Sequence, residues 1–278
     1  MGMTQVPEMP ERVVVIDSAA LDTALALGVK PIGSTIFGEL PDYLGNQTQG
    51  IEIVGEVNQP NLESILQLQP DLILGTKIST ERLYHPLSRI APTVLTEGSG
   101  RSGDWKENFL LFAAALGKTE RANQLIEEYQ QRVSELRTQF NQTHNKSVEE
   151  TQISVLTTGQ GRVGFYTLNS FPGSVLQDIG FARPPAQTRP RRWAAMVSRE
   201  DLDSLDGDVI FLIYSAQGSE SLTVEKFISD PIWSQLSAVQ QGQVYQVNGE
   251  SWIAGRSIQA ADKILDDITQ ALLETRAN

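Results

Sequence analysis

Short apolar segments alternate with helix-like repeats in the first third of the chain. Residues 12–16 form a β-branched run, which is typical of a buried parallel strand. Asp17 then offers an N-cap to a segment rich in alanine and leucine, and Gly28 stands where such a helix usually stops. A helix that begins at Asn61 and a strand at 72–74 repeat this order. The alternation predicts an α/β layer with a parallel sheet.

A much longer helical repeat follows. Residues 119–140 carry apolar side chains at steps of three and four, which predicts one amphipathic helix. At 1.5 Å per residue, this helix would be about 33 Å long. The segment after it, 141–152, is polar and is expected to be a boundary loop. We therefore expect the long helix to join two folded parts of the chain.

The α/β alternation resumes after residue 152. Strands are expected at 153–156, 209–213 and 244–247, and helices at 170–179 and 257–273. The two halves also match in detail. In each half, a glutamate in a first helical turn lies eight residues before an aspartate that opens a strand: Glu63 precedes Asp71, and Glu200 precedes Asp208. This internal repeat predicts two lobes of related topology.

The predicted fold class is therefore α/β, with two Rossmann-like lobes whose central sheets are mainly parallel and which one long rigid helix joins. The chain is expected to divide into four parts. These are a tag or linker remnant at residues 1–10, an N-terminal lobe at 11–118, the connecting helix at 119–141 and a C-terminal lobe at 142–278.

Composition excludes several classes of function. The 278 residues carry a formal net charge of -12, which argues against nucleic acid or an anionic membrane as the main partner. The absence of cysteine removes disulfides, cysteine-based zinc sites and a thiol nucleophile. No run of 18 apolar residues predicts a membrane span. The first four residues lack the pattern of a signal peptide, so we expect the native signal to be missing from this sequence.

Motifs for catalysis or for direct metal binding are weak. Gly159–Gly164 matches G-x-G-x-x-G, but the residues after it are strand-like, which favours a hairpin turn over a nucleotide site. The two histidines, His85 and His144, are far apart and form no ligand pair. We therefore expect a protein that is not an enzyme, that holds no permanent cofactor and that offers no direct ligands to a metal.

Arginine and tryptophan side chains gather in loops beside the ends of the predicted elements. Open α/β sheets bind ligands at such positions, and guanidinium groups beside indoles suit an anionic ligand with flat faces. Two of these loops belong to the second lobe, and the loop that contains Arg101 is assigned to the first. The predicted ligand-binding residues are Arg101, Tyr166, Arg191, Arg192, Trp193, Trp252 and Arg256.

Seven short motifs occur in an order that is known from one protein family. They lie at residues 12–16, 28–33, 60–65, 69–74, 197–200, 230–233 and 242–245. With them, nearly all of residues 11–275 resembles the iron-siderophore and cobalamin class of substrate-binding proteins, which serve ATP-driven importers. The resemblance implies lobes that close only slightly on their ligand. It also implies that Glu63 and Glu200 dock into basic pockets on the two permease subunits.

The second lobe resembles the ferric-hydroxamate branch, whose pocket indoles would fall on Trp193 and Trp252. Arg189, Arg191 and Arg192 make this loop more basic than a neutral hydroxamate needs, and in this respect it is similar to sites for citrate-containing ligands. The resemblance implies a monomer that captures a ferric siderophore between its lobes and delivers it to an ABC importer. Such a protein would be periplasmic or lipid-anchored on the outer face of the cytoplasmic membrane, and the siderophore would hold the iron.

Two alternatives stay open at this point. The first is a haem or cobalamin carrier of the same fold, in which Tyr84, His85 or Tyr166 would be an axial ligand. The second is an enzyme that binds a nucleotide through the Gly159 loop.

Overall fold

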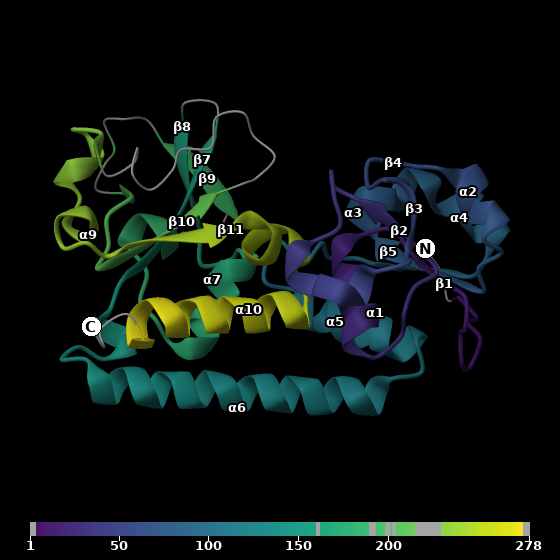
Figure 1. Ribbon diagram of the computed structural model, residues 1–278, viewed down its shortest axis with the longest axis horizontal. Coiled ribbons are helices and arrows are strands. Elements are labelled where there is room, and N and C mark those ends of the chain that lie inside the picture. Colours follow the sequence, from purple (N-terminus) through teal and green to yellow (C-terminus); the bar gives the residue numbers. More distant parts are fainter. Residues whose placement is uncertain are drawn as a thin grey trace. The chain divides into compact units, whose positions relative to one another are not determined.

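The computed structural model describes residues 4–159, 162–188, 193–197, 201, 204–214 and 229–274. The chain divides into two compact units. The first unit consists of Met1–Gly100, Asp104–Glu128 and Ala254–Ala260, and the second of Arg101–Gly103, Tyr129–Ile253 and Ala261–Asn278. Each unit contains a sheet with helices, which confirms the predicted α/β class (Figure 1). The division differs from the expected lobes in two places, because residues 101–103 belong to the second unit and residues 254–260 to the first.

The described part of the first unit holds a six-stranded sheet in the order β4-β3-β2-β1-β5-β6. All neighbouring strands are parallel except β3 and β4, which pair antiparallel. The strands are β1 (Val13–Val15), β2 (Gly33–Ile36), β3 (Glu52–Glu56), β4 (Gln59–Pro60), β5 (Leu72–Thr76) and β6 (Thr93–Thr96). The central strands β1 and β5 are buried along their whole length, as their β-branched and leucine-rich sequences predict.

Helices of the first unit begin where local chemistry favours them. The side chain of Asp17 caps α1, and the side chain of Asn61 caps α2. The helices are α1 (Ser18–Ala26), α2 (Leu62–Gln67), α3 (Lys77–Thr80), α4 (Tyr84–Ile90) and α5 (Trp105–Ala115), with short 3-10 turns at Asp42–Thr48 and Glu81–Leu83. Part of the core is a cluster in which Ile65 of α2 and Leu87 of α4 pack with Val14 and Ile73 of the sheet.

The described part of the second unit holds a five-stranded sheet in the order β11-β10-β7-β8-β9. Strands β7, β10 and β11 are parallel, whereas β8 pairs antiparallel with both β7 and β9. The strands are β7 (Ile153–Gly159), β8 (Arg162–Tyr166), β9 (Ala194–Val197), β10 (Val209–Tyr214) and β11 (Val244–Asn248). Gly159 pairs with Arg162 at the end of the β7–β8 hairpin. The described residues of the glycine-rich motif therefore belong to two paired strands, whereas a dinucleotide site has a helix after such a motif.

The helices of the second unit include the one that was predicted at residues 170–179. In α7 the side chain of Ser170 accepts a hydrogen bond from the Gly173 amide, and Gly180 ends the helix with a left-handed backbone (φ 103°). The helical segments are α7 (Phe171–Ile179), α9 (Ser237–Gln240) and α10 (Ile258–Thr269), with single turns at Val148–Glu150, Pro185–Thr188, Trp233–Gln235, Glu250–Gly255 and Gln270–Glu274.

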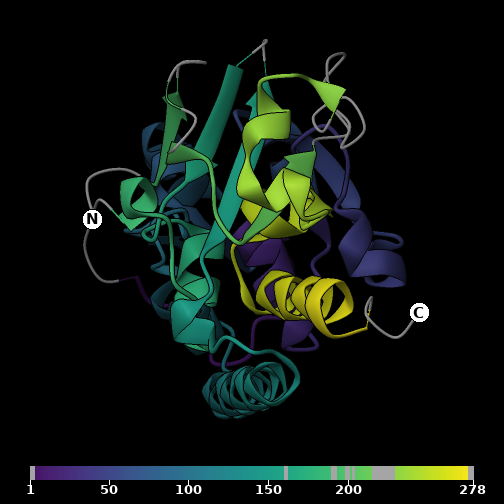
Figure 2. The same cartoon turned by 90° about the vertical axis from the view of Figure 1, so that its left-hand side faces the viewer.

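Helix α6 (Thr119–Thr143) is one 25-residue helix that passes from the first unit into the second. This confirms the predicted long helix, which continues slightly beyond residue 141. In the second unit, α10 lies alongside α6, as Figure 2 shows with α6 seen end-on. Arg132 of α6 joins the two helices, because its guanidinium group pairs with Asp262 and with Asp266 at 2.5 Å each. Among the described helices, none is long and apolar enough to cross a membrane.

Candidate functional site: an arginine and two aromatic rings on the second unit

Two aromatic residues meet where β8 ends and β9 begins. Tyr166 pairs with Ala194 in the sheet register, and the amide of Thr167 donates a hydrogen bond to the Trp193 carbonyl at 3.0 Å. These backbone contacts bring the two rings together, with centroids 5.9 Å apart and planes at 29°. The Tyr166 side chain is buried, whereas Trp193 is 40% exposed. The pair therefore presents the indole to the outside and keeps the phenol beneath it.

Arg101 completes this arrangement, which we call the Tyr166–Trp193–Arg101 cluster. Its guanidinium carbon lies 5.9 Å from the centroid of the Trp193 ring, within the range of a cation–π interaction. The Arg101 carbonyl accepts a hydrogen bond from the Phe171 amide at the start of α7. This bond explains why residues 101–103 belong to the second unit. Our assignment of Arg101 to the first lobe is therefore corrected.

Tyr166 is a neutral phenol in this environment. Burial raises the pKa of Tyr166 to about 12, and this effect outweighs the lowering by a hydrogen bond with Thr157 and by the charge of Arg101. A phenol of this kind can donate a hydrogen bond but does not readily supply a phenolate to a metal. The exposed part of the cluster thus combines a cation and an indole, which suits an anion with a flat or ring-shaped surface.

A buried arginine that sequence reasoning missed supports the cluster from behind. Arg183, which is 6% exposed, donates from Nη2 to the Tyr166 carbonyl at 2.5 Å and to Oε1 of Gln187 at 2.7 Å. The Gln187 carbonyl in turn accepts a hydrogen bond from the Leu168 amide at 2.9 Å. The turn at Pro185–Thr188 and the chain after β8 are thereby joined. The sequence gives little sign of this role, because an arginine before a proline-rich turn is usually exposed.

Trp252 does not belong to the site, and this prediction is corrected. The side chain is completely buried, and its ring lies 4.9 Å from the ring of Phe211. Its indole nitrogen donates a hydrogen bond to Asp267 of α10 at 2.8 Å. A tryptophan with both its ring and its polar atom occupied inside the second unit has no surface to offer a ligand.

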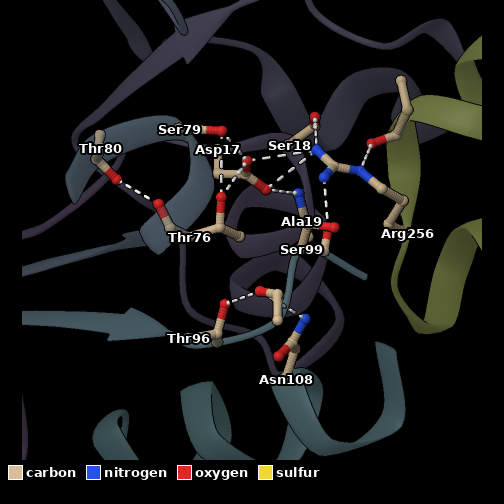
Figure 3. A network of polar contacts seen from close by, with 12 residues as sticks. Asp17, Ser18, Ala19, Thr76, Ser79, Thr80, Thr96, Ser99, Asn108 and Arg256 are labelled. Carbon is tan, nitrogen blue, oxygen red and sulfur yellow. Dashed lines mark hydrogen bonds and ion pairs between the residues drawn. The ribbon is translucent and has the colours of Figure 1, made fainter. Parts of the chain in front are cut away.

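Arg256 is also corrected, because it is a structural residue of the first unit. It is 5% exposed and forms an ion pair of 3.3 Å with Asp17, which is completely buried (Figure 3). Its Nη1 atom donates to the Ser99 carbonyl at 2.5 Å, and its Nε atom donates to Ala254. Thr76 donates a further hydrogen bond to Asp17. The charge of Arg256 is thus neutralised by Asp17, which leaves it little attraction for an anionic ligand.

Three predicted residues, Arg191, Arg192 and Glu200, lie outside the described residues. The other predicted docking residue, Glu63, is exposed in the first turn of α2. Its amide donates to the Asn61 cap at 3.1 Å. Leu66 lies one turn further along this short helix and is 57% exposed. An acidic side chain and an apolar one are therefore both accessible on α2.

The residues considered as haem ligands are not brought together within one unit. Tyr84 and His85 lie side by side in α4 of the first unit, with ring centroids 5.7 Å apart, whereas Tyr166 belongs to the second unit. Within the described part of the chain, no group of three or more His, Cys, Asp or Glu side chains could hold a metal ion.

Each unit holds a sheet with helices, and the residues of helix α6 are divided between the two units. Comparison with known proteins shows which family has this organisation. Residues 13–250 match the family model of periplasmic binding proteins. A probable siderophore-binding lipoprotein of Bacillus subtilis, YfiY, is 33% identical over 98% of this chain and 85% of its own length. The achromobactin-binding periplasmic protein of Dickeya dadantii is 33% identical over 94% of this chain and 86% of its own.

A solved structure gives the same result. Staphylococcus aureus SirA complexed with staphyloferrin B superposes with a TM-score of 0.86 and 28% identity, over 98% of this chain and 96% of that one. The chain therefore belongs to the periplasmic binding protein family.

Proposed function

We propose that this protein captures an anionic ferric siderophore of the citrate or citrate-hydroxamate type and delivers it to an ABC importer. The observation that carries the proposal is the Tyr166–Trp193–Arg101 cluster, in which a guanidinium group and an exposed indole lie 5.9 Å apart. A guanidinium group binds carboxylates through paired, charge-assisted hydrogen bonds. An indole face packs against the carbon skeleton of the chelator. The siderophore supplies the oxygen ligands of its iron, so the protein has to recognise only the outside of the complex.

The names of relatives support this class of ligand. The achromobactin-binding protein matches most of this chain, and so does the Fe(3+) dicitrate-binding periplasmic protein FecB of Escherichia coli, with 26% identity over 96% of the chain. The solved SirA structure contains staphyloferrin B. We infer that the present protein works outside the cytoplasmic membrane, as a periplasmic or lipid-anchored monomer.

The proposed partner in transport is a permease dimer. Glu63 supports this proposal because it is an exposed acid held at the start of a capped helix, where it can meet a basic pocket. Glu200 is proposed as its counterpart in the second half of the chain on the sequence repeat alone. Glu63 belongs to the first unit and the Tyr166–Trp193–Arg101 cluster to the second, so docking through Glu63 and ligand binding can be altered separately.

Binding measurements test the ligand. Purified protein is titrated with ferric citrate and with ferrichrome, a neutral trihydroxamate, and quenching of tryptophan fluorescence by the coloured complexes reports both affinities. Ferric citrate should bind more tightly. Arg101→Gln should weaken ferric citrate by about tenfold or more, because a charge-assisted hydrogen bond contributes roughly 1.5–3 kcal/mol and 1.4 kcal/mol is one decade. The affinity for ferrichrome should change by less than about threefold.

A matched control is Arg121→Gln, which removes an exposed arginine of α6 in the first unit that pairs with Glu128. It should leave both affinities unchanged. Equal losses for the two chelates in Arg101→Gln, or no loss for either, would contradict the proposed role of the cluster. A Soret band after the protein is mixed with haem, together with no binding of either iron chelate, would favour a haem carrier instead.

A further inference from the structure

The guanidinium group of Arg183 lies behind the Tyr166–Trp193–Arg101 cluster, and only one of its three nitrogen atoms donates hydrogen bonds to the described residues. Its Nη2 atom donates two hydrogen bonds, to the Tyr166 carbonyl and to Gln187. Its Nε and Nη1 atoms are buried and have no hydrogen-bond partner among the residues that the structure describes. Gln187 offers Arg183 one side-chain acceptor, its Oε1 atom, which already accepts the bond from Nη2; its amide nitrogen is a donor and is bonded to Ser154 at 2.6 Å. The side chain thus forms fewer bonds than a buried arginine usually does.

No carboxylate of the described residues compensates this charge. The contrast with Arg256 is direct, because that buried arginine pairs with Asp17. For Arg183, burial is the cause that lowers the pKa to about 9, so the side chain is still a cation at neutral pH. A buried and unpaired charge costs folding free energy, which makes its presence next to the candidate site informative.

A charge in this position acts on the cluster without contact. The interior around Arg183 has a low dielectric, in which the field of a charge extends further than it does in water. Its Nη2 atom is 2.5 Å from the Tyr166 carbonyl, and the Tyr166 ring stacks on Trp193. A positive potential from Arg183 therefore adds to that of the exposed Arg101 at the indole face. Arg101 is screened by solvent and salt, whereas Arg183 is screened much less.

We propose that Arg183 is a specificity-determining residue, whose buried charge, which no carboxylate of the described residues neutralises, makes the surface at Trp193 select anions. It does not touch the ligand; it biases the site towards ligands that carry carboxylates. The electrostatic part of this inference holds for any anion at Trp193. Its consequence for ferric siderophores rests on the proposed function.

The experiment uses Trp193 as the reporter of local potential. The other three tryptophans, Trp105, Trp233 and Trp252, are at most 5% exposed, so collisional quenchers in solution reach mainly Trp193. Iodide carries a negative charge, whereas acrylamide is neutral. Stern–Volmer constants for both quenchers are measured on the unliganded protein at constant, low ionic strength. Both constants depend on the accessibility of the indole, but only the iodide constant depends on the electrostatic potential there. The ratio of the iodide constant to the acrylamide constant therefore reports the potential.

Two substitutions separate the charge of Arg183 from its role as a hydrogen-bond donor to the Tyr166 carbonyl. Arg183→Gln removes the charge but keeps a donor for the Tyr166 carbonyl, whereas Arg183→Lys keeps the charge. The iodide constant should fall by about twofold in Arg183→Gln and stay near the wild-type value in Arg183→Lys. The acrylamide constant should not change in either variant. Lys146→Gln is the control, because Lys146 is an exposed cation of the same unit that pairs with Asp208 at 2.6 Å; it should change neither constant.

Other outcomes overturn the proposal. If Arg183→Gln leaves the iodide constant unchanged, the buried charge does not act at Trp193. If both constants change together, Arg183 only holds the Tyr166 segment in place. Circular dichroism checks that the variants fold, and Arg183→Met, a second neutral variant, replaces Arg183→Gln if that one does not.

The effect of Arg183 on the affinity for iron chelates is measured in a separate experiment. Where wild type binds ferric citrate, Arg183→Gln should weaken it by about fivefold and affect ferrichrome by less than about twofold. If wild type binds neither chelate but the iodide effect is present, the proposed function fails and the inference about Arg183 stands.

Discussion

The carboxyl group of Asp22 should make the stability of the first unit depend on pH. This residue of α1 is completely buried. Its carboxyl oxygens accept hydrogen bonds from the amides of Gln259 at 3.0 Å and Ala260 at 2.9 Å, which lie at the start of α10. The Tyr43 hydroxyl donates a third bond at 2.8 Å. All of these residues belong to the first unit, so Asp22 fastens the segment 254–260 to α1.

Burial raises the pKa of Asp22 from 3.8 to about 7, although the hydrogen bonds from Gln259, Tyr43 and Ala260 lower it. The folded state therefore binds a proton more tightly than the unfolded state does. The stabilising contribution is fully present below pH 3.8 and is lost as the pH rises through about 7. At 1.36 kcal/mol per pKa unit, the interval from 3.8 to about 7 corresponds to about 4 kcal/mol.

The assay compares wild type with Asp22→Asn, because an asparagine resembles the protonated carboxyl group and does not titrate. Urea unfolding is followed by circular dichroism at pH values from 4 to 8. The free energy of unfolding of wild type, minus that of Asp22→Asn, should fall by up to about 4 kcal/mol over this range. The protection of the Gln259 and Ala260 amides against exchange, measured relative to the intrinsic rate at each pH, should fall over the same range in wild type only. A difference that does not depend on pH would refute the reasoning.

Three further predictions concern other parts of the chain. Arg256→Met leaves the Asp17 carboxylate buried without its cation, so urea unfolding should show a loss of about 3–5 kcal/mol, and adding Asp17→Asn should recover part of it. Glu128→Pro interrupts α6 and should cost about 3 kcal/mol or more in the same assay, whereas Glu128→Ala removes only an exposed ion pair and should cost about 1 kcal/mol or less. Glu63→Ala should reduce uptake of iron chelate by cells while the affinity of the purified protein for the chelate stays within about threefold.

Controls for these predictions use residues of the same kind. Glu120→Ala, which removes an exposed acid of α6, should leave uptake unchanged. Normal uptake in Glu63→Ala would remove the docking role from that residue. A Glu128→Pro variant that is as stable as Glu128→Ala would mean that α6 does not need to be continuous. A loss below about 1 kcal/mol in Arg256→Met would show that solvent reaches Asp17 and screens its charge.

Elements whose ends depend on local chemistry could be predicted from the sequence. Asp17 and Asn61 were identified with helix starts because short polar side chains reach amides two or three residues further along. Gly28 was identified as a helix end because glycine adopts the left-handed backbone without strain, and its φ is 74°. The long helix α6 was predicted because apolar side chains recur at steps of three and four over residues 119–140. In each case the determining interaction lies within the segment itself.

Burial of a side chain in a loop could not be predicted in this way. Trp193 and Trp252 both lie near arginines and close to strand ends, so their sequence neighbours do not show which of the two is buried. In the structure, Trp193 lies beside the edge strand β9 and is exposed, whereas Trp252 lies inside the second unit. The difference depends on Asp267, which is fifteen residues further along and accepts the indole hydrogen bond. Such partners are set by tertiary packing.

The arginines show what a count of charges misses. Sequence reasoning predicted anion binding from the number of guanidinium groups in loops, which assumes that each of them acts on the ligand equally. The structure separates three cases. Arg256 is buried and neutralised by Asp17, Arg101 is exposed and screened by solvent, and Arg183 is buried with no carboxylate partner in the part of the chain that the structure describes. Affinity for an anion depends on the charge that is left after pairing and screening, so Arg183, which the sequence did not suggest, should affect the choice of ligand more than Arg256, which it did.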